Sequence, residues 1–262
     1  RRFKSRTEWE PVGFFSECLC NSTQFDLMLG FFSSSAINVL SDGFAAFLYN
    51  GGRMRLIIND VLTEQDRNAI SKGEATDQIP YFDLDNIEKI KDTLSERDTH
   101  FFDCLSWLIR NNRLDIKIIS PKNNIGISHT KSGTFSDGIN IVGFDGSCNF
   151  SRTALIDNIE SLTVSCNWDG NIEIAKIDSL KNDFETVFQG KDNNVVYVSA
   201  EKVKTHITNV FKDKSISELL ENEYNILDNR AQESLPLSVI KALKKAQNHV
   251  KIVIERIKQK EE

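Results

Sequence analysis

The sequence predicts an α/β fold in which a mixed β-sheet is flanked by helices, with a smaller α-rich segment at the C-terminal end. Short apolar runs at 25–32 and 53–58 have the length of buried strands. Between them, apolar residues recur with helical spacing over 37–48, and the Asn-Gly-Gly at 50–52 is typical of a helix end. This strand–helix–strand unit favours a parallel strand pair covered by a helix.

An antiparallel part is expected in the second third of the chain. Two runs of β character flank Asp137-Gly138, which is the strongest short hairpin signal in the sequence. A hairpin next to a parallel pair makes the sheet mixed. Residues 62–114 are expected to be mostly helical, most clearly at 101–109. Strands are predicted at 114–119 and 161–166, and a short helix at 151–158.

The character of the sequence changes near residue 170. Helices are predicted at 177–188 and 216–224, a strand at 195–198, and an amphipathic helix up to 257. We therefore expect residues 1–170 to form the main α/β domain. Residues 171–262 would form an α-rich segment that links it to a partner or motor domain.

Composition and charge limit the class of protein. Hydrophobic residues make up 40% and charged residues 27%, which is ordinary for a soluble globular protein. No apolar run has the length of a membrane span and no signal peptide is evident, so we expect a cytoplasmic protein without membrane contact. The net charge of −6 disfavours strong non-specific nucleic-acid binding but leaves a focused cationic cleft open. The basic run with Lys241, Lys244 and Lys245 is expected to be a solvated helix face.

The five cysteines match no zinc-binding pattern, so reduced and partly buried thiols are expected, without a metal or other cofactor. His100 is expected to cap the start of a helix rather than to bind a metal. Trp107 and Trp168 are expected in the core.

The candidate chemistry is confined to one region of about thirty residues. It contains three short motifs, in the order His129-x-Lys131, Gly146-Ser147-x-Asn149 and Asn158-x-Glu160. The first motif alone occurs by chance in many chains, but the ordered set across a hairpin is a specific signal. Together the motifs supply an imidazole, a cation, hydroxyl and amide donors, and a carboxylate.

These groups suit metal-independent phosphodiester cleavage. A neutral imidazole at His129 can attack phosphorus and form a phosphohistidine. Lys131 and Asn149 can hold the non-bridging oxygens, with Ser147 as a further donor. Glu160 can accept a hydrogen bond from the other imidazole nitrogen and fix its tautomer. A second acid must protonate the leaving oxygen, and one cassette has one histidine, so two copies around a two-fold axis are expected.

The register of the hairpin decides whether these side chains meet. His129 and Lys131 lie on one face of their strand, and Ser147 and Asn149 share a face of the return strand. A two-residue loop would put the two pairs on opposite faces, whereas a three-residue loop or a bulge would bring them together. We predict the converging register, or a local bulge that has the same effect.

The ordered motifs resemble the phospholipase D superfamily, in the single-cassette form found in small nucleases. The segments Gly30-Phe-Phe-Ser-Ser-Ser35 and Asn50-Gly-Gly-Arg-Met-Arg-Leu-Ile57 further resemble the nuclease-like domain attached to superfamily 2 helicases of restriction and phage-defence systems. The resemblance covers roughly residues 25–166. It implies a mixed sheet between helices, a homodimer with a shared site and metal-independent cleavage, frequently of DNA.

By this resemblance, His129 is the nucleophile or acid, Lys131 and Asn149 bind phosphate, and Glu160 orients the imidazole. Ser147, with Gly146 before it, has a supporting role. The chain departs from the superfamily pattern, which places an aspartate four residues beyond the lysine; five residues separate Lys131 from Asp137, so Asp137 is expected to be a turn residue. No nucleotide-binding P-loop motif is present, so a helicase or ATPase would be a separate domain or subunit.

The leading hypothesis is a homodimeric endonuclease that cleaves DNA in a restriction or phage-defence system. The alternative is a non-catalytic dimerisation or DNA-docking module that keeps the fold. A third reading, a lipid phosphodiesterase, is weakened because the sequence offers no clear interfacial helix with an exposed apolar face.

Overall fold

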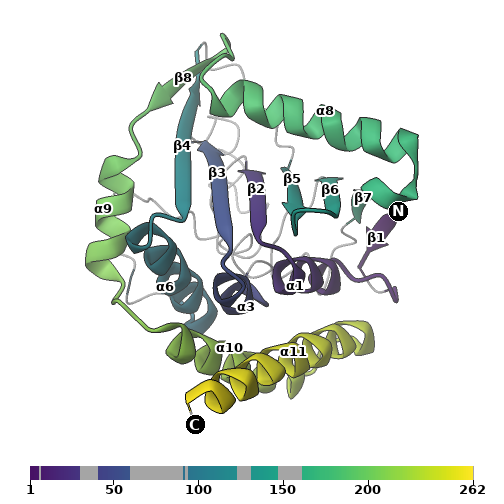
Figure 1. The fold of residues 1–262 in the computed structure, drawn as a ribbon, viewed down its shortest axis with the longest axis vertical. Helices are drawn as coiled ribbons and strands as arrows, with labels where there is room; N and C mark the ends of the chain where they lie inside the picture. The colour runs from purple at the N-terminus through teal and green to yellow at the C-terminus, as the bar shows by residue number, and fades with distance from the viewer. Residues whose placement is uncertain are drawn as a thin grey trace, which may run out of the picture.

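The computed structural model describes residues 1–5, 7–29, 41–59, 91, 94–122, 131–146 and 161–261. The strands in these ranges form one eight-stranded mixed sheet in the order β1-β7-β6-β5-β2-β3-β4-β8 (Figure 1). Their bounds are β1 (Arg2–Lys4), β2 (Gln24–Leu29), β3 (Arg53–Asn59), β4 (Leu114–Pro121), β5 (Lys131–Ser136), β6 (Ile141–Gly146), β7 (Ser161–Cys166) and β8 (Val195–Val198). The predicted α/β class, with helices flanking a mixed sheet, is confirmed.

The helices lie on both faces of the sheet. Those in the described ranges are α1 (Pro11–Asn21), α3 (Phe44–Tyr49), α6 (Glu96–Arg110), α8 (Asn171–Phe188), α9 (Glu201–Val210), α10 (Ile216–Ala231) and α11 (Leu237–Glu261), with a 3₁₀ turn η3 (Asn167–Asp169) before α8. Strands β2, β3 and β4 are parallel, and the remaining strand pairs are antiparallel. The predicted parallel unit and the later hairpin are therefore both present.

Successive side chains along each strand point to opposite faces of the sheet, and both faces are covered by apolar packing. On one face, Ile57 and Ile119 pack with Phe184 of α8 in a small apolar cluster. The other face carries the main core, in which Phe25 and Phe135 stack with ring centroids 4.0 Å apart. Helices α1, α3 and α6 contribute to this core, and α10 and α11 pack outside them (Figure 1).

The ends of several helices follow from local chemistry. In α6, the Ser95 hydroxyl accepts the N–H of Asp98 while the Asp98 carboxylate accepts the N–H of Ser95, a reciprocal capping box. Ser215 and Glu218 make the same arrangement at the start of α10. Gly51, at φ 84°, supplies the left-handed conformation that ends α3, as its sequence predicts.

One predicted helix begins later in the structure than the sequence indicates. The helix predicted over 37–48 begins only at Phe44, because residues 41–43 form a turn in which Gly43 has φ 104°. Residues 37–40 lie outside the described part, as do most of the helical stretch predicted over 62–114 and the helix predicted at 151–158. Helices α1 and α9 and strand β1 were not predicted.

The predicted division at residue 170 falls within a shared core. Helix α8 packs on β5, β6 and β7, and β8 pairs with β4 at the edge of the same sheet. Val203 of α9 and Leu243 of α11 belong to the same apolar cluster as the residues of β2. The two-part organisation remains a prediction, with apolar packing continuous across its boundary.

Candidate functional site

One edge of the sheet brings together the described residues of the predicted site. Strands β2, β3 and β4 end there, and β5 begins there at Lys131. We call it the carboxyl edge. Lys131 is the Cα partner of Gly146, the last residue of β6. The H-x-K and G-S-x-N motifs therefore extend from neighbouring positions on two paired strands.

The other predicted catalytic and supporting residues, His129, Ser147, Asn149 and Glu160, lie outside the described residues. Their roles remain predictions.

Lys131 is a buried lysine. Its side chain is 4% exposed and lies on the face of β5 that it shares with Phe135, whose ring contacts Phe14 and Phe15 of α1. Lysine is rarely this buried, because removing an ammonium group from water is costly unless other groups compensate. A buried lysine at the start of β5 is consistent with an amino group held in place for a function.

The hairpin register corrects one sequence prediction. Ser136 pairs with Ile141, so the loop has four residues, 137–140, rather than two or three. If the same register continued, Ser147 and Asn149 would face away from Lys131. The three-residue loop that we predicted is therefore wrong. Convergence now requires the second option, a bulge, among residues outside the described part.

Asp137 has the predicted turn role. Its Oδ1 accepts the backbone N–H groups of Ile139 and Asn140 at 2.9 and 2.7 Å, and its Oδ2 accepts the side-chain amide of Asn140 at 2.8 Å. These hydrogen bonds lower the pKa of the exposed Asp137 carboxyl. The loop lies at the opposite end of β5 from Lys131.

Asn59 is a polar residue at the carboxyl edge that the sequence reasoning missed. It ends β3, and its Oδ1 is buried with no hydrogen-bond partner among the described residues. A polar residue directly after an apolar parallel strand is a recognisable signal, since ligands of open α/β sheets bind beyond the carboxyl ends of their strands.

We expected His100 to cap the start of a helix, and that prediction is wrong. It lies in the second turn of α6, only 2% exposed, and its Nε2 lies 3.1 Å from Oε2 of Glu223 on α10. The Glu223 carboxylate also accepts the N–H groups of Gly43 and Ala45 at 3.1 and 2.7 Å. Burial raises the pKa of Glu223 above its ordinary value. The cluster ties α10 to α6 and to the start of α3.

This buried cluster does not have the geometry of a catalytic triad. The Cys104 thiol lies 3.7 Å from His100 Nε2, the same nitrogen that faces Glu223, whereas a triad uses both imidazole nitrogens. Burial also raises the pKa of Cys104 well above its ordinary value, which disfavours the thiolate.

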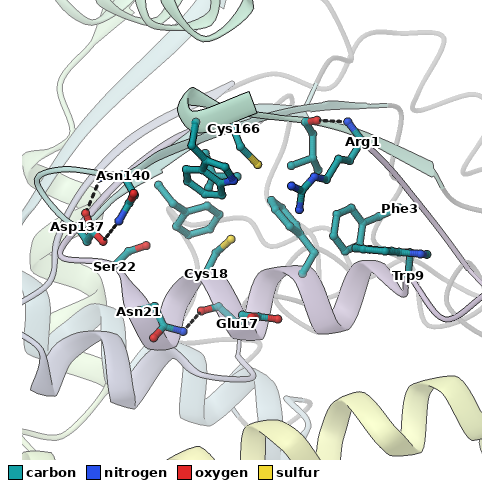
Figure 2. Close-up of a pocket in the computed structure, with 15 residues that line it drawn as sticks. Arg1, Phe3, Trp9, Glu17, Cys18, Asn21, Ser22, Asp137, Asn140 and Cys166 are labelled. Carbon is teal, nitrogen blue, oxygen red and sulfur yellow. Dashed lines mark hydrogen bonds between the residues drawn. The ribbon is translucent and has the colours of Figure 1, made fainter. Parts of the chain in front are cut away.

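A cavity of about 410 Å³ lies near the opposite end of the sheet from Lys131, between α1 and strands β5, β6 and β7 (Figure 2). Its walls include Phe14, Phe135 and Trp168, and the turn residue Asp137 lies at its border. Trp168 is 52% exposed and so is not the core residue that we predicted. The cavity is separate from the candidate site.

The cysteines have the predicted free-thiol form in the described ranges. Cys18 and Cys166 line the cavity and neither is in a disulfide (Figure 2). Burial raises the pKa of both thiols, so they are protonated at neutral pH. Within the described ranges, no group of three or more metal-ligating side chains is arranged to hold an ion.

Comparison of the sequence with protein-family models and with curated proteins found no match. No helix in the described ranges has the length and apolar content needed to cross a membrane.

Proposed function

We propose that the chain is a metal-independent phosphodiesterase that cleaves DNA as a homodimer, through a covalent phosphohistidine on His129. The observation that supports this most is the position of Lys131. It is a buried lysine, two residues from His129, paired with Gly146 at the carboxyl edge of a mixed sheet. The last residue of the first motif is thereby paired with the first residue of the second.

The proposed reaction has two displacements. An imidazole nitrogen of His129 attacks phosphorus, and the bond from phosphorus to the leaving oxygen breaks. His129 of the partner subunit donates a proton to that oxygen. Water then attacks the phosphohistidine and gives a proton to His129 of the partner subunit, the N–P bond breaks, and both histidines are restored. Lys131 and Asn149 would stabilise the charge on the non-bridging oxygens in both steps, and Glu160 would orient the imidazole.

The biological setting proposed is a restriction or phage-defence system, with a helicase or ATPase as the partner that delivers DNA. Two sequence features support it: the resemblance of segments 30–35 and 50–57 to nuclease domains of such helicases, and the net charge of −6. A negatively charged nuclease gains from a partner that brings the substrate to it.

The test is cleavage of plasmid and single-stranded DNA in excess EDTA, with the oligomeric state measured on the same samples. We expect wild-type cleavage to persist. His129→Ala should lower the cleavage rate by about 10²–10⁴-fold, and Lys131→Met should lower it by about 10²–10³-fold. His206→Ala, a partly buried histidine on α9, is the matched control and should leave the rate unchanged.

Loss of wild-type cleavage in EDTA would contradict the metal-independent mechanism. Absence of cleavage by an intact dimer, with and without metal, would instead favour the alternative, a non-catalytic dimerisation or DNA-docking module.

A further inference from the structure

The outer face of α11 is an unusual concentration of positive charge. Residues 237–261 hold seven Lys or Arg and two Glu, so this helix carries +5 in a chain whose net charge is −6, and the rest carries −11. All seven cationic side chains are exposed: Lys241, Lys244, Lys245, Lys251, Arg256, Lys258 and Lys260. At 1.5 Å per residue they extend over about 28 Å of helix.

Most of these cations are not neutralised by the protein itself. Lys245 pairs with Glu17 of α1 at 2.8 Å, in an exposed ion pair, and Lys251 lies 4.0 Å from Glu255. Within the described part of the chain, none of the other five forms an ion pair. Exposed pairs contribute little to stability, so packing α11 against the body does not explain the charge.

We propose that the outer face of α11 binds the phosphate backbone of nucleic acid. The apolar face of the helix, with Val239, Leu243 and Val250, is already buried against its neighbours α1 and α10. A helix that binds at a membrane interface needs that face for lipid. A protein-binding surface depletes lysine in its core, whereas nucleic-acid interfaces are polar and strongly positive. The lysine-rich outer face fits the last class.

The position of α11 defines the role of this contact. Figure 1 shows the helix along the end of the molecule opposite the carboxyl edge, so it does not reach the candidate site on the same subunit. Phosphates held by α11 would lie away from the bond that is cut. The contact would therefore set affinity and its salt dependence, and it would not require that the protein cleave DNA.

The experiment compares two triple variants that change the net charge equally, both in a His129→Ala background that blocks the proposed cleavage. One is Lys241→Gln/Lys244→Gln/Lys258→Gln on α11. The matched control is Lys4→Gln/Lys191→Gln/Lys212→Gln, three exposed lysines outside α11. Binding of a fluorescent DNA duplex is measured by anisotropy over a series of salt concentrations.

We expect the α11 variant to lower the slope of log affinity against log salt by about 2–3, at about 0.9 for each lost phosphate contact, and the control to leave it unchanged. Equal slopes for the two variants, or no salt-dependent binding by the parent protein, would overturn the proposal. So would competition by polyglutamate as effective as that by unlabelled DNA. Because binding is the readout, failure of the cleavage proposal leaves this test interpretable.

Discussion

At the scale of single residues, a substitution of Lys131 tests whether this lysine serves function or stability. Burying an amino group is costly, and methionine keeps the length of the apolar stem without that cost. We expect Lys131→Met to lower the free energy of unfolding by no more than about 2 kcal/mol, while cleavage falls as stated above. Urea unfolding followed by circular dichroism measures this. Destabilisation by more than about 2 kcal/mol would mean that Lys131 mainly holds the fold together.

Glu223 is expected to be a purely structural carboxylate. It is 1% exposed and accepts hydrogen bonds from Gly43 and Ala45 besides its contact with His100. Glu223→Gln should lower the free energy of unfolding by about 3 kcal/mol, because the amide cannot satisfy the same donors. Glu221→Gln, an exposed carboxylate on the same helix, should change it by less than about 0.5 kcal/mol. Equal losses of unfolding free energy in the two variants would contradict a structural role for the Glu223 hydrogen bonds.

The stability difference between wild type and Glu223→Gln is also expected to depend on pH. Burial raises the pKa of Glu223, so the folded state binds this proton more tightly than the unfolded state. The contribution of Glu223 to stability is therefore largest below its ordinary pKa, falls as pH rises toward the raised value, and is constant above it. The difference in unfolding free energy between wild type and Glu223→Gln should decrease with rising pH from about 4 upward. An increase of this difference with rising pH would contradict a raised pKa of Glu223 in the folded state.

At the scale of elements, the capping box of α10 is testable. Ser215→Ala removes the hydroxyl that accepts the N–H of Glu218 and should cost about 1 kcal/mol of unfolding free energy. Ser217→Ala, an exposed serine inside the same helix, is the control and should cost nothing. A similar loss for both variants in thermal or urea unfolding would argue against a specific cap.

Close packing between β5 and β2 leaves no room for a side chain at Gly133. A Cβ atom there would lie 2.4 Å from the carbonyl oxygen of Asp26 and 2.8 Å from the Phe144 ring. We expect Gly133→Ala to destabilise the protein by about 2–3 kcal/mol, since the clash is with backbone that cannot move freely. Ser132→Ala, the neighbour on the other face, should be near neutral in the same unfolding assay. A tolerated Gly133→Ala would show that the strands can separate locally.

At the scale of the whole molecule, most of the sheet could be predicted, but the edge strand β1 could not. Apolar runs and the Asp137-Gly138 signal located seven of the eight described strands, because burial and turn chemistry are local properties. Strand β1 has three residues and no alternation to detect. Helix α3 starts late because Gly43 adopts a left-handed conformation that helical periodicity does not encode.

The candidate site was predictable in its parts but not in its register. The order of the motifs identified Lys131 and Gly146, which are neighbours at the carboxyl edge. The loop length between them depends on the hydrogen bonds that Asp137 makes to Ile139 and Asn140, which a two-residue sequence signal does not reveal. His100 was misassigned because its partner, Glu223, is distant in sequence.

The most direct test of the central claim is to trap the covalent intermediate. Wild type and His129→Ala are mixed with phosphate-labelled DNA in excess EDTA, quenched in alkali, which preserves an N–P bond, and digested to map the label. We predict labelled protein only with wild type, with the label on the peptide that contains His129. EDTA-resistant cleavage without such an adduct, or a label that persists in His129→Ala, would contradict the phosphohistidine mechanism.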